Sequence, residues 1–305
     1  MTTAFITHPD CLKHEMGPHH PECPARLQAV YDAFERSALM SRLRLVEAPL
    51  ATREQLSAAH APDYVDAIFD AAPIHDYAAL DPDTSMNRFS LAAAQRAAGA
   101  VVKGVDMVMT GDADNAFCAV RPCGHHATYN RAMGFCIFNN VAVGAAHALE
   151  THGLDRVAIL DFDVHHGNGT EDIFVDDDRV MLCSSFQHPY YPGTGANSGN
   201  AHIIPTPLPA RTAGAAFRAA IERTWFPALE RFEPELIIIS AGFDAHVDDP
   251  LAYLELVEDD YTWITQRIRE LADAYAGGRI VSALEGGYNL DALGRSAVAH
   301  VKALM

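Results

Sequence analysis

Short apolar runs recur along this chain between longer segments that have helical periodicity. Runs such as RVAIL at 156–160 and LIIIS at 236–240 are apolar at four of five positions in a row, which is typical of strands buried on both faces of a parallel sheet. The pattern predicts strands at residues 4–7, 115–120, 156–160, 180–184, 236–240 and 280–284.

The segments between these strands predict helices. The periodicity is clearest at 26–38, where Leu27, Val30, Tyr31 and Phe34 fall on one side. Further helices are expected at 52–61, 62–69, 90–109, 134–150 (after a loop), 212–231, 258–275 and 291–304, with a helix or turn at 172–178. Alternating strands and helices indicate an α/β fold, a mainly parallel sheet covered on both faces. We find no internal repeat or linker.

Three segments predict loops. The His- and Pro-rich stretch 8–24 is expected to be a flexible surface loop, and 76–86 is an acidic loop. Residues 187–209 form a long loop rich in proline and glycine. A loop of that size inside a compact domain usually has a function.

Polar motifs follow four of the predicted strands. They are RPCGHHA at 121–127, DFDVHHGNGT at 161–170, AGFDAHVDDP at 241–250 and EGGYN at 285–289. Ligands of parallel α/β sheets bind beyond the carboxyl ends of the strands. We therefore expect these motifs to form one site.

The second and third motifs offer metal ligands. If the strand at 156–160 continues, Asp161, Asp163 and His165 share one face, since side chains alternate along a strand. Two carboxylates beside an imidazole are costly to bury unless a cation joins them. Asp163, His165 and Asp244 make a three-ligand set with an open fourth position, as catalytic zinc requires. Taken alone, Asp244 is better explained as a helix cap, and its place after a strand and a glycine is what favours a ligand role.

The other two motifs offer acid–base groups. A base among His125 and His126 could accept a proton from water and later protonate a leaving amine, while Asp161 orients one imidazole. The hydroxyl of Tyr288, after two glycines, could donate to a developing oxyanion, although a packed core aromatic is an equal alternative.

The net charge and the composition of the chain limit which binding partners and cellular locations are expected. Lys+Arg is 22 and Asp+Glu is 40, giving a net charge of -18, which disfavours binding to nucleic acid or to an anionic membrane. No apolar run reaches membrane-spanning length, and the N-terminus lacks a signal-peptide pattern. The 6 cysteines form no CxxC pair, so a cytoplasmic location is expected.

Together the motifs resemble the zinc-dependent histone deacetylase family, which includes acetylpolyamine amidohydrolases and belongs to the arginase–deacetylase superfamily. RPCGHHA is similar to the family's RPPGHHA, with Cys123 in place of a proline, and GFCIFNN at 134–140 and PGTG at 192–195 also match. Asn168 and the HPECPAR loop are similar to the class II branch. The resemblance implies a single deacetylase domain over 1–305, with the arginase–deacetylase fold and its mostly eight-stranded parallel sheet.

The resemblance also implies roles for the site residues. Zinc would be held by Asp163, His165 and Asp244, with His125 and His126 as tandem catalytic histidines and Tyr288 polarising the acyl carbonyl. Many members have a second aspartate where this chain has Asn168, so His126 should be held less strongly as imidazolium. A structural potassium ion would be bound by Asp161, Ser184 and the backbone oxygens of Asp163 and His165.

The implied activity is removal of acetyl or other short acyl groups from the ε-amine of lysine, or alternatively from acetylated polyamines. Residues expected to contact substrate are Gly134, Phe135, Tyr191, Leu251 and Asp83. Phe135 and Tyr191 could wall a slot for a slender alkyl chain. The resemblance matches Asp83 with the family's loop aspartate that holds the substrate backbone. Leu251 stands where polyamine-selective class II members have an acidic gatekeeper.

Two rival functions remain open at this level. A dimanganese ureohydrolase would want further carboxylates where this chain has Gly167 and His246. A non-catalytic acyl-lysine-binding module would not need the intact His–His pair, tyrosine and ligand set. The sequence also leaves the oligomeric state open, a homo-oligomer included.

Overall fold

Eight parallel strands form the central sheet of this protein, whose structure is a computed structural model describing residues 1–305. Their order is β2-β1-β5-β10-β9-β6-β7-β8, and every neighbouring pair is parallel. The strands are β1 (Thr3–Thr7), β2 (Arg44–Glu47), β5 (Asn115–Cys118), β6 (Val157–Asp161), β7 (Val180–Gln187), β8 (Ile203–Leu208), β9 (Leu236–Ala241) and β10 (Ile280–Leu284). The predicted α/β class is confirmed.

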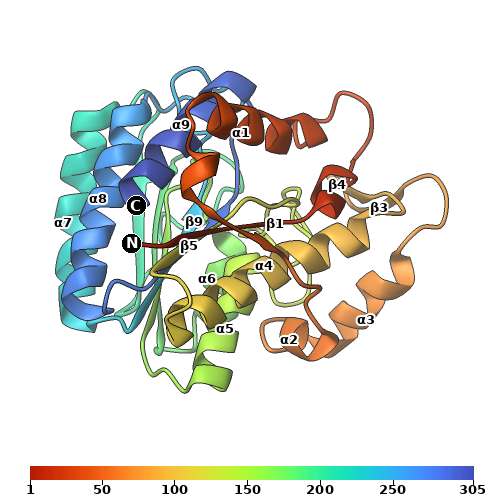
Figure 1. The fold of residues 1–305 in the computed structure, drawn as a ribbon, viewed down its shortest axis with the longest axis horizontal. Coiled ribbons are helices and arrows are strands. Elements are labelled where there is room, and N and C mark those ends of the chain that lie inside the picture. Colours follow the sequence, from red (N-terminus) through yellow and green to blue (C-terminus); the bar gives the residue numbers. More distant parts are fainter.

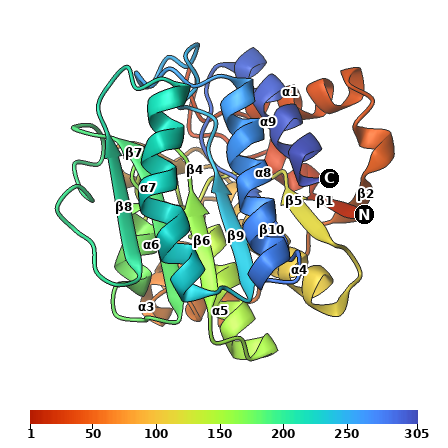
Figure 2. The same ribbon diagram turned by 90° about the vertical axis from the view of Figure 1, so that its left-hand side faces the viewer.

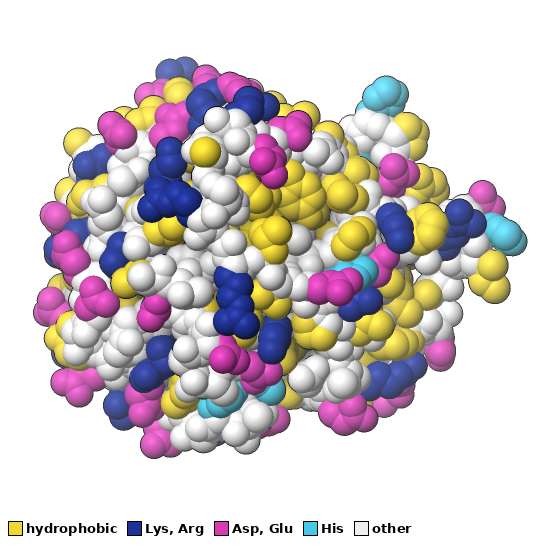
Figure 3. All heavy atoms as spheres, viewed as in Figure 1, with side chains coloured by type: hydrophobic (Ala, Val, Ile, Leu, Met, Phe, Trp, Pro, Cys, Tyr) yellow, Lys and Arg dark blue, Asp and Glu magenta, His cyan; other side chains and the backbone are white.

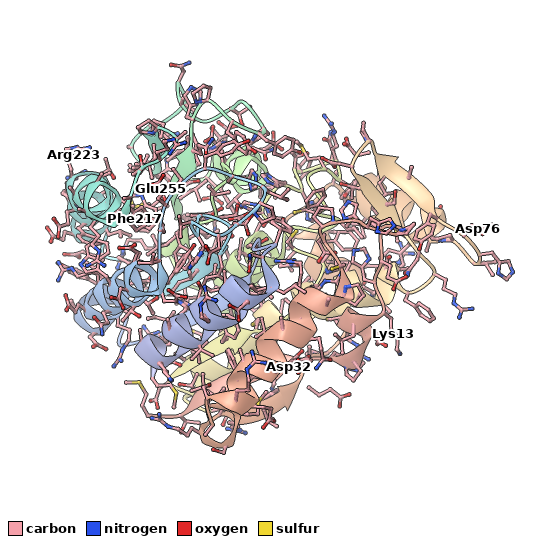
Figure 4. All side chains as sticks on the ribbon, turned by 90° about the horizontal axis from the view of Figure 1, so that it is seen from above. Lys13, Asp32, Asp76, Phe217, Arg223 and Glu255 are labelled. Atoms are coloured by element: carbon pink, nitrogen blue, oxygen red, sulfur yellow. The ribbon has the colours of Figure 1, made fainter.

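Helices cover both faces of the sheet (Figures 1 and 2). One layer contains α1 (Pro24–Arg36), α7 (Gly214–Phe232), α8 (Glu258–Tyr275) and α9 (Leu290–Leu304). The other contains α4 (Ser90–Thr110), α5 (Asn140–His152) and α6 (Asn168–Phe174), flanked by α2 (Arg53–Ser57) and α3 (Pro62–Ala71). Amphipathic helices make such layers possible: on α7, Phe217 points inward and Arg223 away from the body (Figure 4).

The four strands that precede polar motifs are neighbours at the centre of the sheet, in the order β5-β10-β9-β6. Their carboxyl ends therefore meet at one edge, as the sequence predicted. One part of that reasoning was wrong, because β6 ends at Asp161 and the chain bends before His165. Asp163 and His165 thus converge through a loop and not through strand alternation.

Five further elements differ from the prediction. β2 and β8 were not expected, and β8 lies within the segment 187–209 that was predicted to be loop. The segment predicted as an acidic loop contains an antiparallel hairpin, β3 (Ala78–Asp81) with β4 (Thr84–Met86). Asp76 lies on the projecting chain that leads into it (Figure 4). α6 begins at Asn168, before the segment 172–178 that was predicted to be helix or turn.

The His-rich segment 8–24 is anchored and not a free surface loop. It contains a short 3-10 helix (Pro9–Leu12), and the side chains of His14 and Glu22 are fully buried. Arg121 donates to both carboxylate oxygens of Glu22, each at 2.5 Å. This buried ion pair fixes the segment against the carboxyl edge of the sheet.

Acidic and basic side chains are interspersed over the face seen in Figure 3, around hydrophobic surface near its centre. None of the helices combines the length and apolar character needed to cross a membrane.

Candidate active site

Asp163, His165 and Asp244 bring their ligand atoms together where β6 and β9 end. His165 Nδ1 lies 3.0 Å from Asp163 Oδ1 and 3.2 Å from Asp244 Oδ2, and all three side chains are buried or nearly so. Burial, together with the nearby Asp163 carboxylate, raises the pKa of Asp244 to about 7. Asp244 Oδ2 is buried and accepts no hydrogen bond. This donor set fits one divalent cation such as zinc.

Gly286 allows the two carboxylates to approach the β10 loop. A Cβ atom at this position would lie 2.1 Å from Asp244 Oδ2 and 2.6 Å from Asp163 Oδ2, distances that no side chain tolerates. Its N–H instead donates to Asp163 Oδ2 at 2.9 Å. The glycine pair before Tyr288 therefore shapes the metal-ligand cluster as well as the tyrosine loop.

The tandem histidines follow β5 and lie beside this cluster. His125 Nδ1 lies 2.8 Å from Asp161 Oδ2, and His126 Nδ1 lies 2.7 Å from Asn168 Oδ1. Because an amide oxygen only accepts, His126 Nδ1 carries the hydrogen and its Nε2 is left free as a base. The expected pairing of each histidine with its own partner is present in the geometry.

The two histidines have opposite electrostatic environments. Burial alone would lower the pKa of His125, but the carboxylates of Asp161 and Asp163 outweigh burial and raise it well above its usual range. Burial lowers the pKa of His126 well below its usual range, and the neighbouring imidazoles of His125 and His165 lower it further. The pair therefore separates into a cationic and a neutral imidazole.

The Tyr288 loop is held by two residues that the sequence reasoning missed. Asp249 Oδ2 accepts the N–H groups of Tyr288 at 2.7 Å and Asn289 at 3.2 Å. Arg26 donates to the carbonyls of Gly287 at 2.6 Å and Glu285 at 2.5 Å, and its guanidinium lies 4.8 Å from the Tyr288 ring centre. The HPECPAR match was the one available signal for Arg26, and the DDP turn gave none for Asp249.

A cavity of about 240 Å³ opens above these residues. Its walls include all five residues expected to contact substrate, and Tyr190 adds a residue that was not predicted. His126 lines this cavity whereas His125 lies behind it. The lining residues are Asp83, His126, Gly134, Phe135, His165, Tyr190, Tyr191, Leu251 and Tyr288.

Close packing and hydrogen bonds hold the walls of the cavity in place. Gly134 has a φ of 58°, and a Cβ atom there would lie 2.4 Å from His126 Cδ2. Asp83 Oδ1 accepts the N–H of Gly134 at 3.1 Å, which leaves Asp83 Oδ2 without a hydrogen bond from the chain. Tyr190 donates its hydroxyl to the Leu251 carbonyl at 2.5 Å. The aspartate in the β3–β4 turn thus lies at the cavity with one oxygen free.

Behind the histidines, Asp161 and Ser184 are register partners on β6 and β7. Their carboxylate and hydroxyl oxygens offer hard ligands, which is the donor type a potassium ion would need here. The dimanganese alternative would need a second divalent ion beside Asp163, with carboxylates at positions 167 and 246. Neither position supplies one. Gly167 has no side chain, and His246 Nδ1 accepts the N–H of Asp248 at 3.0 Å.

Comparison with known proteins shows the family to which this chain belongs. Residues 20–304 match the histone deacetylase domain family. The chain is 37% identical to a "Histone deacetylase-like amidohydrolase" of Pseudomonas aeruginosa, covering 94% of this chain and 82% of that protein. It is 38% identical to "Histone deacetylase 14, chloroplastic" of Arabidopsis thaliana, covering 94% and 73% respectively.

A solved structure extends the likeness to the fold. The crystal structure of the HDA15 HD domain aligns with a TM-score of 0.94 at 34% identity, covering 99% of this chain and 88% of that one. The eight-stranded sheet with its two helical layers is thus the arginase–deacetylase fold, and this chain belongs to the histone deacetylase family.

Proposed function

We propose that this protein is a zinc-dependent amidohydrolase that removes acetyl or other short acyl groups from the ε-amine of lysine in proteins or peptides. The supporting observation is the convergence of Asp163, His165 and Asp244 with His126 and Tyr288 around one narrow cavity. A metal-binding module would need the first three residues only. The added base and hydroxyl favour catalysis.

A zinc ion held by these ligands would polarise the acyl carbonyl and lower the pKa of water. His126 Nε2 accepts the proton from the attacking water and later passes it to the leaving amine. Asp161 holds His125 as imidazolium next to the metal ligand Asp163. Tyr288 donates its hydroxyl to the acyl oxygen as negative charge develops.

The cavity walls support lysine as the substrate. Phe135 and Tyr191 enclose a slender alkyl chain, and Asp83 Oδ2 is available at the rim for a substrate backbone N–H. Leu251 places no negative charge where a polyamine's second amine would lie, so acetylated polyamines are the second candidate.

Potassium at Asp161 and Ser184 would be structural. The cysteines are all free, which supports a reducing, cytoplasmic location.

A variant pair tests the catalytic metal site. Asp244→Ala should lose the zinc that survives gel filtration and should lose activity against acetyl-lysine peptides. Asp248→Ala is the matched control, because this side chain is 54% exposed on the same loop, and it should keep both. An Asp244→Ala protein that keeps as much zinc as the wild type through gel filtration would exclude the assignment. Assaying the wild type with acetyl-lysine peptides, longer acyl-lysines and acetylated polyamines then ranks the substrates.

A further inference from the structure

A second group of metal-binding side chains lies away from the cavity, between α4 and α5. Its members are Asp106 on α4 and His147 and His152 on α5. The Nε2 atoms of both histidines point at the same carboxylate oxygen, Asp106 Oδ1, at 2.8 and 2.9 Å. The two helices pack side by side (Figure 1).

The helix packing explains why these side chains meet. Gly144 on α5 faces Val101 on α4, and a Cβ atom on the glycine would lie 2.4 Å from Val101 Cγ1. The missing side chain lets the helix axes approach. Asp106 lies farther along α4, His147 lies one turn farther along α5, and His152 reaches the group from the last residue of α5.

Three features distinguish this group from an ordinary surface ion pair. Asp106 forms no ion pair with lysine or arginine, so the two imidazoles are its charge partners. Thr151 Oγ1 lies 3.1 Å from His147 Nδ1 and fixes that ring with Nε2 toward Asp106, an arrangement common among metal-ligating histidines. The Asp106 side chain is 39% exposed and that of His152 is 18% exposed, so an ion and its water ligands can enter from solvent.

We propose that Asp106, His147 and His152 form a second, solvent-accessible binding site for a divalent transition metal, zinc being the test ion. Ligand atoms about 2.0–2.1 Å from zinc at tetrahedral angles lie about 3.3–3.4 Å apart. The present separations of 2.8 and 2.9 Å therefore need to widen by only about half an ångström, within the reach of side-chain rotation at a helix end. Water completes the coordination, and the net charge of -18 favours cations at this surface.

Equilibrium dialysis against buffered free zinc, followed by a metal count, tests the proposal. The wild type should hold two zinc ions per chain and His152→Ala one. Asp106→Asn, which keeps the side-chain shape, should also hold one and serves if His152→Ala folds poorly. His75→Ala, which removes a single exposed histidine, is the matched control and should hold two.

Two further readouts separate this site from the catalytic one. Asp244→Ala should keep one zinc ion, and Asp244→Ala combined with His152→Ala should keep none, whatever the catalytic outcome. Zinc added to the one-ion form should raise the Tm of the wild type and not that of His152→Ala, since binding to the folded state alone stabilises it. An Asp244→Ala protein that binds no zinc, or a His152→Ala protein that binds as many zinc ions as the wild type, would overturn the proposal.

Discussion

Asn168→Asp tests how the neutral histidine is maintained. His126 Nδ1 donates to Asn168 Oδ1 at 2.7 Å, so an aspartate in the same rotamer keeps the hydrogen bond and adds a full negative charge beside the ring. The folded geometry changes little, because the two side chains have nearly the same shape. The substitution therefore changes the pKa of His126 with little steric effect.

The magnitude follows from the short separation. With about 4 Å between the centres of charge and an effective dielectric constant of about 20, the attraction is about 4 kcal/mol. That energy corresponds to about 3 pKa units, and desolvation of the new carboxylate reduces it, so a rise of about 1–3 units is expected. The present pKa of His126 is low mainly because of burial and the neighbouring His125 imidazolium.

The assay is the dependence of kcat/KM on pH. A higher pKa keeps His126 protonated to higher pH, so the acid limb should move up by the same 1–3 units and activity below it should fall. Asp172→Asn is the control, since this exposed carboxylate on α6 bonds the N–H of Tyr129, and its profile should be unchanged. An acid limb that stays in place in Asn168→Asp would refute His126 as the base tuned by this contact.

Three other outcomes are expected. Tyr288→Phe should lower kcat by about 10²–10³ with little change in KM or zinc content, and turnover within about threefold of the parent would make Tyr288 a packing residue. Leu251→Glu should shift the kcat/KM ratio toward acetylated polyamines by about tenfold, equivalent to about 1.4 kcal/mol, measured with matched acetyl-lysine and acetylpolyamine substrates. Burial lowers the pKa of His300 to about 3, so the unfolded chain binds a proton below pH about 6.5 that the folded protein excludes, and stability falls as pH drops through this window. His300→Gln should make the free energy of unfolding less steeply pH-dependent there, by about 1.4 kcal/mol per pH unit, and an unchanged slope would contradict the buried neutral state.

The central strands could be predicted because burial on both faces demands apolar residues at every position. The two edge strands could not. β2, with the sequence RLVE, is largely exposed and has no apolar run. β8 contains Pro205 and Pro207, which look like loop residues and are tolerated because an edge strand has one neighbour to bond. Only the family resemblance implied eight strands where the pattern predicted six.

The site was predictable where polar residues directly follow apolar strands, as they do at Asp161, Asp244 and Tyr288. It was not predictable where a residue acts from a distant segment. Arg26 looks like a solvated residue of α1, yet its side chain is fully buried beneath the β10 loop. Asp249 looks like part of a polar turn, yet it accepts backbone N–H groups from residues almost forty positions later.

The buried contacts of Glu22 and Arg26 connect the N-terminal segment 8–24 and the start of α1 to the proposed catalytic residues. Glu22 is shared by Arg121, which leads into the histidine motif, and by Arg26, which holds the tyrosine loop. The two guanidinium groups lower the pKa of the Glu22 carboxylate to about 2 despite its burial, so these three groups together carry a net positive charge. Burial raises the pKa of Tyr288 well above its usual range, which keeps its hydroxyl protonated as a donor, while Arg26 opposes that rise. A cation held 4.8 Å from the ring therefore favours the negative charge that the proposed reaction develops on the oxygen facing Tyr288.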